Sequence, residues 1–457
     1  MQNKTFSTKL TAFDLFVSLR SRRHPFILDS GMDPEKLGRY SFVGADPFLT
    51  FSSKDDQCRI DQADGTEELH TEDPFTLLKR LLQQYTVRPR EGLPFAGGAV
   101  GYFGYDLCHF IEKLPRKAVD DVSVPDCFFG FYDGIFVFDH QKNTVDIVAL
   151  GLAGPVEETL HRLELQLSAA AEQPPAIIPF HNSAPADLHT NMTKEEYVQA
   201  IQRVREYIRS GDIYQANYTQ RFDCGFAGDP VAFFAALRSK NPAPFAAYID
   251  TGECIVVSSS PERFLRIHNG VIETRPIKGT ISRGITAAED EQNMQTLLQS
   301  EKDRAELLMI VDLERNDLSR IAKTGTVEVP ELFVIETYAT VHHLVATVTA
   351  ELRPDCDLID CIRATFPGGS ITGAPKIRAM EIIDELEPTQ RNVYTGSIGY
   401  LGFDGNMDMN IVIRTVVIKG QRAYFQAGGG IVWDSDPEME YQESLTKARA
   451  LMEVLRS

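Results

Sequence analysis

Two acidic residues in the segment 301–322 could help to bind a divalent cation. Asp303 and Glu306 are three residues apart, so on a helix they share one face. Carboxylate oxygens are the ligands that Mg²⁺ prefers, usually with several waters retained. The sequence therefore predicts half of a magnesium site here, whereas no spacing of His and Cys suggests zinc.

A second acidic helix is expected over 437–455. Its residues Glu440, Glu443 and Lys447 project from one helical face. The plain alternative is a solvated charged stripe in which Glu443 pairs with Lys447. If the two helices meet, one carboxylate from each would complete the magnesium site.

Two glycine-rich segments offer backbone amides to an anion. Gly428, Gly429 and Gly430 are consecutive, so no side chain blocks the main chain, although a flexible turn is the alternative. A second segment, 366–380, is a glycine-rich turn that enters a helix, and the first amides of that helix could hold a carboxylate. It is not a phosphate loop, because Ala374 stands where that motif requires lysine.

Glu262 and Lys278 form a candidate pair for covalent chemistry. The sixteen residues from one to the other allow a turn and a returning strand that would bring them together. On the surface they would make an ordinary salt bridge. In an apolar cleft they could act as an acid and a nucleophile.

The elements around these residues predict an α+β fold with a large antiparallel two-sheet core flanked by helices. Residues 1–165 form an N-terminal segment of short strand-like runs, with a hairpin around 139–143. Prolines and weak periodicity favour a linker over 166–190, and 191–457 is the expected catalytic domain. Strands in runs followed by helices argue against a doubly wound parallel sheet.

Local signals mark several element ends. Thr193 and Glu196 fit a capping box that begins a helix ending at Gly211. Turns are expected at Gly405 and Gly420, between the strands of a late meander.

Composition limits the partners and the compartment. The 457 residues include 65 acidic and 46 basic side chains, and the net charge of −19 makes nucleic acid an unexpected partner. The chain shows no apolar run long enough to cross a membrane and no signal peptide. Seven cysteines without a CxxC pair predict reduced, mostly buried thiols and a cytoplasmic protein.

Taken together, these segments resemble those of the chorismate-utilising enzymes. This family includes the first components of anthranilate synthase and aminodeoxychorismate synthase, and the isochorismate and salicylate synthases. The resemblance covers 193–450 in consistent order, and the N-terminal third is also similar through ILDSGMDPEKLGRYSFVGADP. The stretches that carry it are GDIYQANYTQRF, SSSPERF, TRPIKGT, KDRAELLMIVDLERNDLSRIA, TYATVHHLVATV, FPGGSITGAPKIRAM, GSIGYL, NIVIRTVVI and QAGGGIVWDSDPEMEYQESLTKARA. It implies a fold like that of anthranilate synthase component I.

Two positions separate the members of this family. The variable position of the PIxGT motif is alanine in the anthranilate synthase pattern and lysine in the aminodeoxychorismate synthase pattern, and here it is Lys278. Isochorismate and salicylate synthases have a lysine where this chain has Gln215. The resemblance therefore implies the activity of aminodeoxychorismate synthase component I, which makes 4-amino-4-deoxychorismate from chorismate and ammonia for 4-aminobenzoate and folate synthesis.

The resemblance also implies roles for the charged residues. Glu306 and Glu443 would bind Mg²⁺, with Asp303 and Glu440 acting through water. Mg²⁺ would anchor and polarise the ring carboxylate of chorismate.

The covalent step that the resemblance implies has Glu262 as general acid at the C4 hydroxyl and Lys278 as nucleophile at C2. Ammonia would then attack C4 and expel the lysine. Holding a free lysine neutral at pH 7 costs about 4.6 kcal/mol, so burial or a neighbouring cation must lower that cost. We therefore expect Lys278 to lie buried beside Glu262.

Further residues would line the substrate pocket by the same resemblance. The glycines would donate backbone amides to the carboxylates of chorismate, and Arg414 could bind a carboxylate through two nitrogens. The full set is Gln215, Thr280, His343, Ser370, Tyr394, Arg414, Gly428, Gly429, Gly430 and Lys447.

Two partners follow from the resemblance. No glutaminase motif occurs in the chain, so a separate glutamine amidotransferase subunit would supply ammonia. The family also has an aromatic amino-acid pocket, whose walls are similar to 27–31, 38–41 and 241–245 here, and that pocket could hold tryptophan.

Two other functions remain open at this point. Anthranilate synthase component I would release anthranilate and pyruvate from chorismate. A non-catalytic protein that binds chorismate and Mg²⁺ would consume nothing, and the presence of both Glu262 and Lys278 argues against it.

Overall fold

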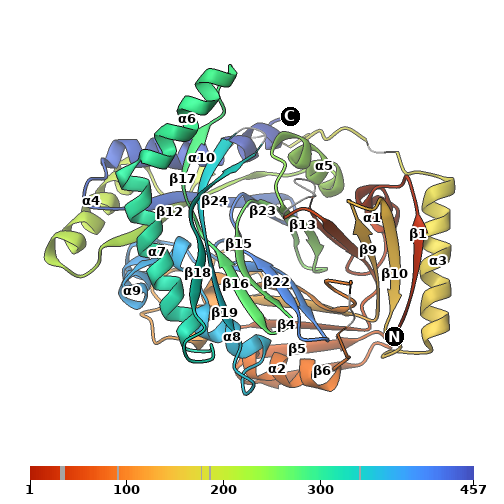
Figure 1. The fold of residues 1–457 in the computed structure, drawn as a ribbon. Coiled ribbons are helices and arrows are strands. Elements are labelled where there is room, and N and C mark those ends of the chain that lie inside the picture. Colours follow the sequence, from red (N-terminus) through yellow and green to blue (C-terminus); the bar gives the residue numbers. More distant parts are fainter. Residues whose placement is uncertain (31–36, 90–91, 177, 185–186, 339–340) are drawn as a thin grey trace.

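Two large antiparallel sheets form the centre of the computed structural model, and helices flank them (Figure 1). The structure describes all residues except 31–36, 90–91, 177, 185–186 and 339–340. Within these described residues, every pair of neighbouring strands in either sheet runs antiparallel. The predicted α+β class is confirmed.

The first sheet combines strands from both ends of the chain. In spatial order its strands are β1 (Gln2–Ser7), β10 (Thr144–Ala149), β9 (Gly134–Asp139), β3 (Tyr40–Gly44), β2 (Phe26–Asp29), β13 (Phe245–Asp250), β14 (Ile255–Ser260), β23 (Thr415–Lys419), β24 (Arg422–Ile431), β12 (Gln215–Gly225) and β11 (His189–Thr190), with β20 (Gly373–Ala374) also paired to β12.

The second sheet is built in the same interleaved way. Its strands are, in order, β17 (Ile277–Ser282), β19 (Val341–Glu351), β16 (Val271–Arg275), β15 (Arg263–His268), β22 (Met407–Asn410), β21 (Ser397–Gly402), β7 (Gly98–Phe103), β8 (Cys127–Tyr132), β4 (Leu49–Lys54), β5 (Gln57–Gln62) and β6 (Glu67–Thr71), and β18 (Glu328–Thr337) pairs with β19.

Helices pack on the outside of this arrangement. Those that contact the first sheet are α1 (Ala12–Leu19), α3 (Val156–Glu172), α4 (Lys194–Ser210), α5 (Pro230–Lys240), α9 (Lys376–Leu386) and α10 (Pro437–Leu455). The helices that contact the second sheet are α2 (Pro74–Gln84), α6 (Ala287–Gln299) and α7 (Glu301–Ser319), and α8 (Leu358–Thr365) packs on α2 and α7. Two short 3₁₀ helices, η1 (Tyr105–Phe110) and η2 (Gly369–Ile371), connect other elements.

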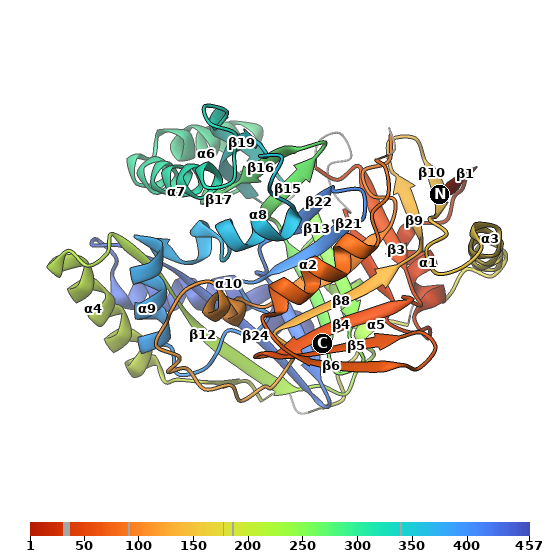
Figure 2. The same cartoon turned by 90° about the horizontal axis from the view of Figure 1, so that it is seen from below.

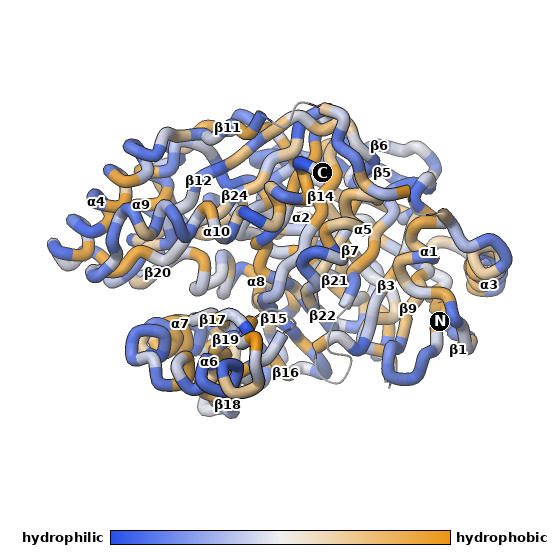
Figure 3. The backbone as a smooth tube through the Cα atoms, turned by 90° about the horizontal axis from the view of Figure 1, so that it is seen from above, coloured by the Kyte–Doolittle hydropathy of each residue, from blue (hydrophilic) through white to orange (hydrophobic). Residues whose placement is uncertain are grey.

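The main apolar core joins the two sheets. Phe26 and Val256 enter it from the first sheet, and Phe103 and Phe129 from the second. A second core lies where α1, α3, α5 and α10 cover the first sheet, so both faces of that sheet are apolar. The hydropathy-coloured tube shows apolar segments through the interior and polar ones along the outer helices (Figure 3).

Several local predictions are confirmed. Thr193 and Glu196 form both bonds of the capping box, and α4 ends at Gly211 in the left-handed conformation. β9 and β10 pair as the predicted hairpin. All seven cysteines are free thiols, and only Cys356 is not fully buried.

The boundary of the predicted linker needs correction. Helix α3 runs through Glu172, because Leu160, Leu163 and Leu167 fall at helical spacing and pack into the second core. The linker predicted over 166–190 therefore overlaps the end of this helix. Strands from 1–165 and from 191–457 share both sheets.

The elements of the candidate site gather at one end of the molecule. Helix α7 packs on β17 and β19, and α10 packs on β24. The view from below shows α6, α7, β17 and β19 as one corner of the molecule (Figure 2). No helix in the described part has both the length and the apolar character needed to cross a bilayer.

Candidate active site

A strand hairpin brings Glu262 and Lys278 to one place. Glu262 directly precedes β15, and β16 returns so that Arg275 stands opposite Arg263. Lys278 follows as the second residue of β17. Glu262 is only 6% exposed and Lys278 is half-buried, so neither side chain projects freely into bulk water.

Ser370 connects this pair. Lys278 Nζ donates a hydrogen bond to the Ser370 carbonyl oxygen at 3.3 Å. Burial raises the pKa of Glu262, and hydrogen bonding from the Ser370 side chain opposes this rise in part. Burial also lowers the pKa of Lys278, against the charges of Glu306 and Glu262. The site therefore favours a protonated carboxyl beside a neutral amine.

Arg414 and His343 face the same region. Burial lowers the pKa of Arg414, and the nearby Glu262 carboxylate opposes this. In the described part, no side chain forms a hydrogen bond or ion pair with the Arg414 guanidinium, so it is available to an anion. Burial is the main cause that lowers the pKa of His343 to about 4, and the positive charge of Arg414 is the second. His343 Nδ1 lies 2.8 Å from Thr280 Oγ1. His343 is therefore neutral at pH 7.

Charged residues of the two acidic helices act on one another electrostatically. Lys447 Nζ forms an ion pair with Glu443 Oε1 at 2.7 Å, so the predicted surface pairing within α10 is present. Glu443 also acts electrostatically on Glu306 of α7. Burial raises the pKa of Glu306 and of Glu440. Burial acts in the same direction on Glu443, but Lys447, Lys302 and Lys278 together outweigh it, and the net pKa is lowered.

These carboxylates fit Mg²⁺ without forming a closed cage. Asp303 and Glu306 are partly buried on α7, and Asp303 adds its charge to that of Glu306. Among the described residues, no three His, Cys, Asp or Glu side chains stand at metal-ligand spacing. Mg²⁺ usually takes one or two carboxylates together with waters and substrate oxygens, so two opposing glutamates suffice.

The three glycines lie on β24 and divide between two faces. A Cβ at Gly429 would lie 3.2 Å from Glu440 Oε2 and 3.4 Å from Glu443 Oε1, so this residue faces the acidic cluster. A Cβ at Gly430 would lie 2.4 Å from Gln215 Nε2, and one at Gly428 would lie 2.0 Å from a backbone oxygen. Gly428 therefore has no room for a side chain, whereas a side chain at position 430 would require Gln215 to move.

Gln215 is fully buried, and both polar atoms of its amide lack a hydrogen-bond partner in the described part of the chain. Buried polar atoms are normally satisfied, so an unmet amide beside Gly430 indicates a place for a ligand group or a water.

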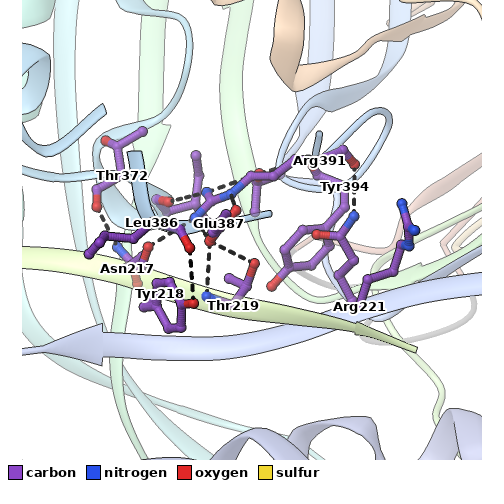
Figure 4. Close-up of polar contacts among 12 residues, drawn as sticks. Asn217, Tyr218, Thr219, Arg221, Thr372, Leu386, Glu387, Arg391 and Tyr394 are labelled. Carbon is purple, nitrogen blue, oxygen red and sulfur yellow. Dashed lines mark hydrogen bonds and ion pairs between the residues drawn. The ribbon is translucent and has the colours of Figure 1, made fainter. Parts of the chain in front are cut away.

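Sequence reasoning missed a buried ion pair beside Tyr394. Arg391 Nε and Nη2 each lie 2.8 Å from the carboxylate of Glu387, and both side chains are almost inaccessible (Figure 4). Glu387 caps the end of α9 and Arg391 lies beyond the helix, so no helical spacing indicates this pair. Tyr394 lies next to this pair, and the described contacts do not join it to Lys278 or Glu262.

A separate cavity of about 320 Å³ opens between the sheets, away from these residues. Its lining includes Asp29, Ser30, Tyr40 and Phe245, from the segments in which the sequence predicts an aromatic amino-acid pocket. Gly31, the last residue of the first segment, lies outside the described residues.

A family model described as chorismate binding enzyme matches residues 24–453. The chain belongs to this family. Aminodeoxychorismate synthase component 1 of Escherichia coli (strain K12) is 43% identical over 431 residues, covering 94% of this chain and 92% of that protein. Anthranilate synthase component 1 of Acetivibrio thermocellus is 39% identical over 97% of this chain and 92% of its own length.

Solved structures agree with this placement in the chorismate binding enzyme family. Anthranilate synthase component I from Streptococcus pneumoniae TIGR4 superposes with a TM-score of 0.80 and is 33% identical, covering 91% of this chain and 92% of that one. The fold expected from the sequence, like that of anthranilate synthase component I, is confirmed.

Proposed function

We propose that this chain is the chorismate-converting component of an aminodeoxychorismate synthase. The observation that carries the proposal is the buried Glu262 beside a half-buried Lys278 whose amine donates to Ser370. An anthranilate synthase with alanine at this position would have no nucleophile there. The 43% identity to the Escherichia coli protein supports the same choice.

The proposed reaction uses both members of the pair. Glu262 gives its proton to the C4 hydroxyl, which leaves as water while the Lys278 nitrogen forms a bond to C2 of the ring. Ammonia then attacks C4, the ring double bonds shift back, and the C2–nitrogen bond breaks. The net change is replacement of hydroxyl by amino, with one water released for each ammonia consumed.

The charge states of the pair suit these steps. Burial holds Glu262 towards its protonated form and Lys278 towards its neutral form. These two directions favour an acid that can give a proton and an amine that can attack through its lone pair.

Other residues would orient the substrate. Arg414 presents a guanidinium that has no side-chain partner among the described residues and can hold a carboxylate through two hydrogen bonds. Neutral His343 can exchange hydrogen bonds with a substrate oxygen without adding charge. Gln215 offers both a donor and an acceptor from a buried position.

We propose that Glu306 and Glu443 would hold Mg²⁺, with Asp303 and Glu440 acting through water. Bound there, Mg²⁺ would neutralise and polarise a substrate carboxylate. Glu306→Gln should raise the Mg²⁺ concentration for half-maximal activity at least about tenfold. Glu301→Gln, an exposed residue of the same helix, is the control. The Mg²⁺-dependent rise in unfolding temperature should weaken in parallel, and an unchanged rise would contradict the assignment.

The decisive experiment is mass analysis of the product formed from chorismate, ammonium and Mg²⁺. We expect 4-amino-4-deoxychorismate, which retains the enolpyruvyl group, and loss of its formation in Lys278→Ala. Lys323→Ala, on the surface, is the matched control. Release of anthranilate and pyruvate would support anthranilate synthase instead. Binding of chorismate without consumption would support the non-catalytic alternative.

Ammonia would come from a glutamine amidotransferase subunit. The relatives carry the name component 1, which implies a second component in those proteins. Glutamine should replace ammonium only when such a subunit is added, and the product would serve 4-aminobenzoate and folate synthesis.

The cavity at Asp29 would bind an aromatic amino acid, with tryptophan as the first candidate. Phe245 and Tyr40 offer ring contacts, and the Asp29 carboxylate is buried, paired with Arg238 and bonded to Ser41. Calorimetric titration with L-tryptophan should show one site that Phe245→Ala weakens. No heat change at millimolar tryptophan would overturn this assignment.

A further inference from the structure

The carbonyl oxygen of Ser370 accepts hydrogen bonds from two side chains. Lys278 Nζ donates at 3.3 Å and Asn217 Nδ2 donates at 3.1 Å. A carbonyl oxygen has two lone pairs, so these donors fill its capacity. The position of this oxygen therefore helps to determine where the Lys278 nitrogen lies.

Asn217 also holds the chain just beyond Ser370. Its backbone N–H donates to the Thr372 carbonyl at 2.7 Å, and its side-chain amide reaches the same oxygen at 3.2 Å. Asn217 stands on β12 opposite Gly430, in the interior of the first sheet. One residue of a buried strand thus anchors the carbonyls on both sides of Ile371.

Arg391 anchors the carbonyl between them. Its Nη1 donates to the Ile371 carbonyl at 3.0 Å, and its Nη2 donates to the Asn217 carbonyl at 2.9 Å. The Glu387 carboxylate holds the guanidinium on its remaining side and itself accepts bonds from the backbone and hydroxyl of Thr219 (Figure 4). Three successive carbonyls, at 370, 371 and 372, are fixed by two buried side chains.

We propose that Asn217 and Arg391 are positioning residues that aim the Lys278 amine by fixing the Ser370 carbonyl. This inference rests on the proposed function of Lys278 as nucleophile. A neutral amine that donates one N–H to a fixed carbonyl directs its lone pair away from that carbonyl. If the Ser370 carbonyl is not held in place, the Lys278 amine is still present but no longer points in one direction. A misplacement of about 1 Å can lower the rate about 100-fold.

The first test replaces Asn217 with alanine. We expect kcat to fall about 10- to 100-fold with ammonium as nitrogen source, while KM for chorismate stays within about twofold. The matched control is Asn182→Ala. Asn182 is also buried, and its side-chain amide donates to two backbone carbonyls, of Gly225 and Leu455. It should lower the unfolding temperature to a similar extent and leave kcat unchanged.

A double-mutant cycle separates positioning from general stability. In a Lys278→Ala background, which can still consume chorismate slowly by direct addition of ammonia, adding Asn217→Ala should cause no further loss of this residual consumption, because the amine that Asn217 orients is gone. An equal loss in both backgrounds would overturn the positioning role. Asn217→Ser replaces the alanine variant if the latter does not fold, since a serine hydroxyl is too short to reach both carbonyls.

The cycle also distinguishes this inference from the proposed function. If Lys278→Ala abolishes formation of 4-amino-4-deoxychorismate and Asn217→Ala does not change kcat, only the positioning role is wrong. If Lys278→Ala turns over chorismate to the same product at the normal rate, the proposed function fails, and the positioning role fails with it.

Discussion

The ammonium group of Lys447 lies 2.7 Å from the Glu443 carboxylate, one helical turn earlier, and 3.0 Å from the Gly428 carbonyl. The Lys447 side chain is therefore already paired with Glu443, one of the two carboxylates proposed to bind Mg²⁺.

Replacing Lys447 with methionine should remove this competing cation. We expect the Mg²⁺ concentration that gives half of the maximal thermal stabilisation to fall by up to about fivefold, as for loss of a partly exposed ion pair. KM for chorismate should rise at the same time if Lys447 also contacts a substrate carboxylate. Lys302→Met is a comparison variant, since Lys302 lies 3.9 Å from Glu306. Weaker Mg²⁺ binding in Lys447→Met would contradict this account.

Alanine at Gly428 should lower the stability of the protein, whereas alanine at Gly429 should affect ligand binding. A Cβ at Gly428 would overlap the Tyr218 carbonyl, so β12 and β24 must move apart, at a cost of about 1–3 kcal/mol in the free energy of unfolding. The three atoms nearest to a Cβ at Gly429 are the ends of the Glu440, Glu443 and Lys447 side chains. We expect Gly429→Ala to keep the wild-type unfolding temperature and to weaken Mg²⁺ or chorismate binding. Equal destabilisation by both variants would be inconsistent with the two faces of β24.

The buried histidine in the site should make stability depend on pH. Folded His343 stays neutral down to about pH 4, whereas the unfolded residue takes up a proton near pH 6.5. Between these values the unfolded chain binds more protons, so the free energy of unfolding falls as pH falls, by about 3 kcal/mol over the whole window.

The variant His343→Gln removes this contribution. Its unfolding temperature should fall less than that of the wild type between pH 7 and pH 5, as measured by thermal denaturation. His161→Gln, at an exposed position, should behave like the wild type. The same pH dependence in His343→Gln and in the wild type would argue against a neutral buried His343.

The Arg391–Glu387 pair should be costly to break from one side. Arg391→Met leaves the Glu387 carboxylate buried without its partner, at a cost of about 3–5 kcal/mol. The double variant with Glu387→Met should lose less than the sum of the two single variants, measured by urea denaturation. The exposed pair Arg203–Glu206 is the control, and Arg203→Met should cost less than about 1 kcal/mol. Additive losses at Arg391 and Glu387 would show that the pair contributes no coupling.

Local chemistry explains which parts of the fold could be predicted. The capping box at Thr193 and the hairpin around 139–143 depend on neighbours a few residues away, so both can be predicted from the local sequence alone. The pairing of Asp29 with Ala246 depends on the packing of distant strands, which no local pattern specifies.

The candidate site divides in the same way. Residue type and motif identified Glu262, Lys278 and the two acidic helices. Asn217 and Arg391 act through backbone carbonyls, which every residue possesses, so no side-chain motif distinguishes their partners at 370–372. The overlap of α3 with the expected linker has a local cause, because the leucine spacing that predicts this helix continues through Leu167.

The interleaving of the sheets has a consequence for synthesis on the ribosome. β7 pairs with β21 and β2 pairs with β13, and both partner strands are synthesised much later. The first third of the nascent chain therefore emerges with unpaired strand edges. Neither sheet can close until nearly the whole chain has left the exit tunnel. Newly made protein therefore passes through an interval in which chaperones and proteases compete for it before the acid and the amine come together.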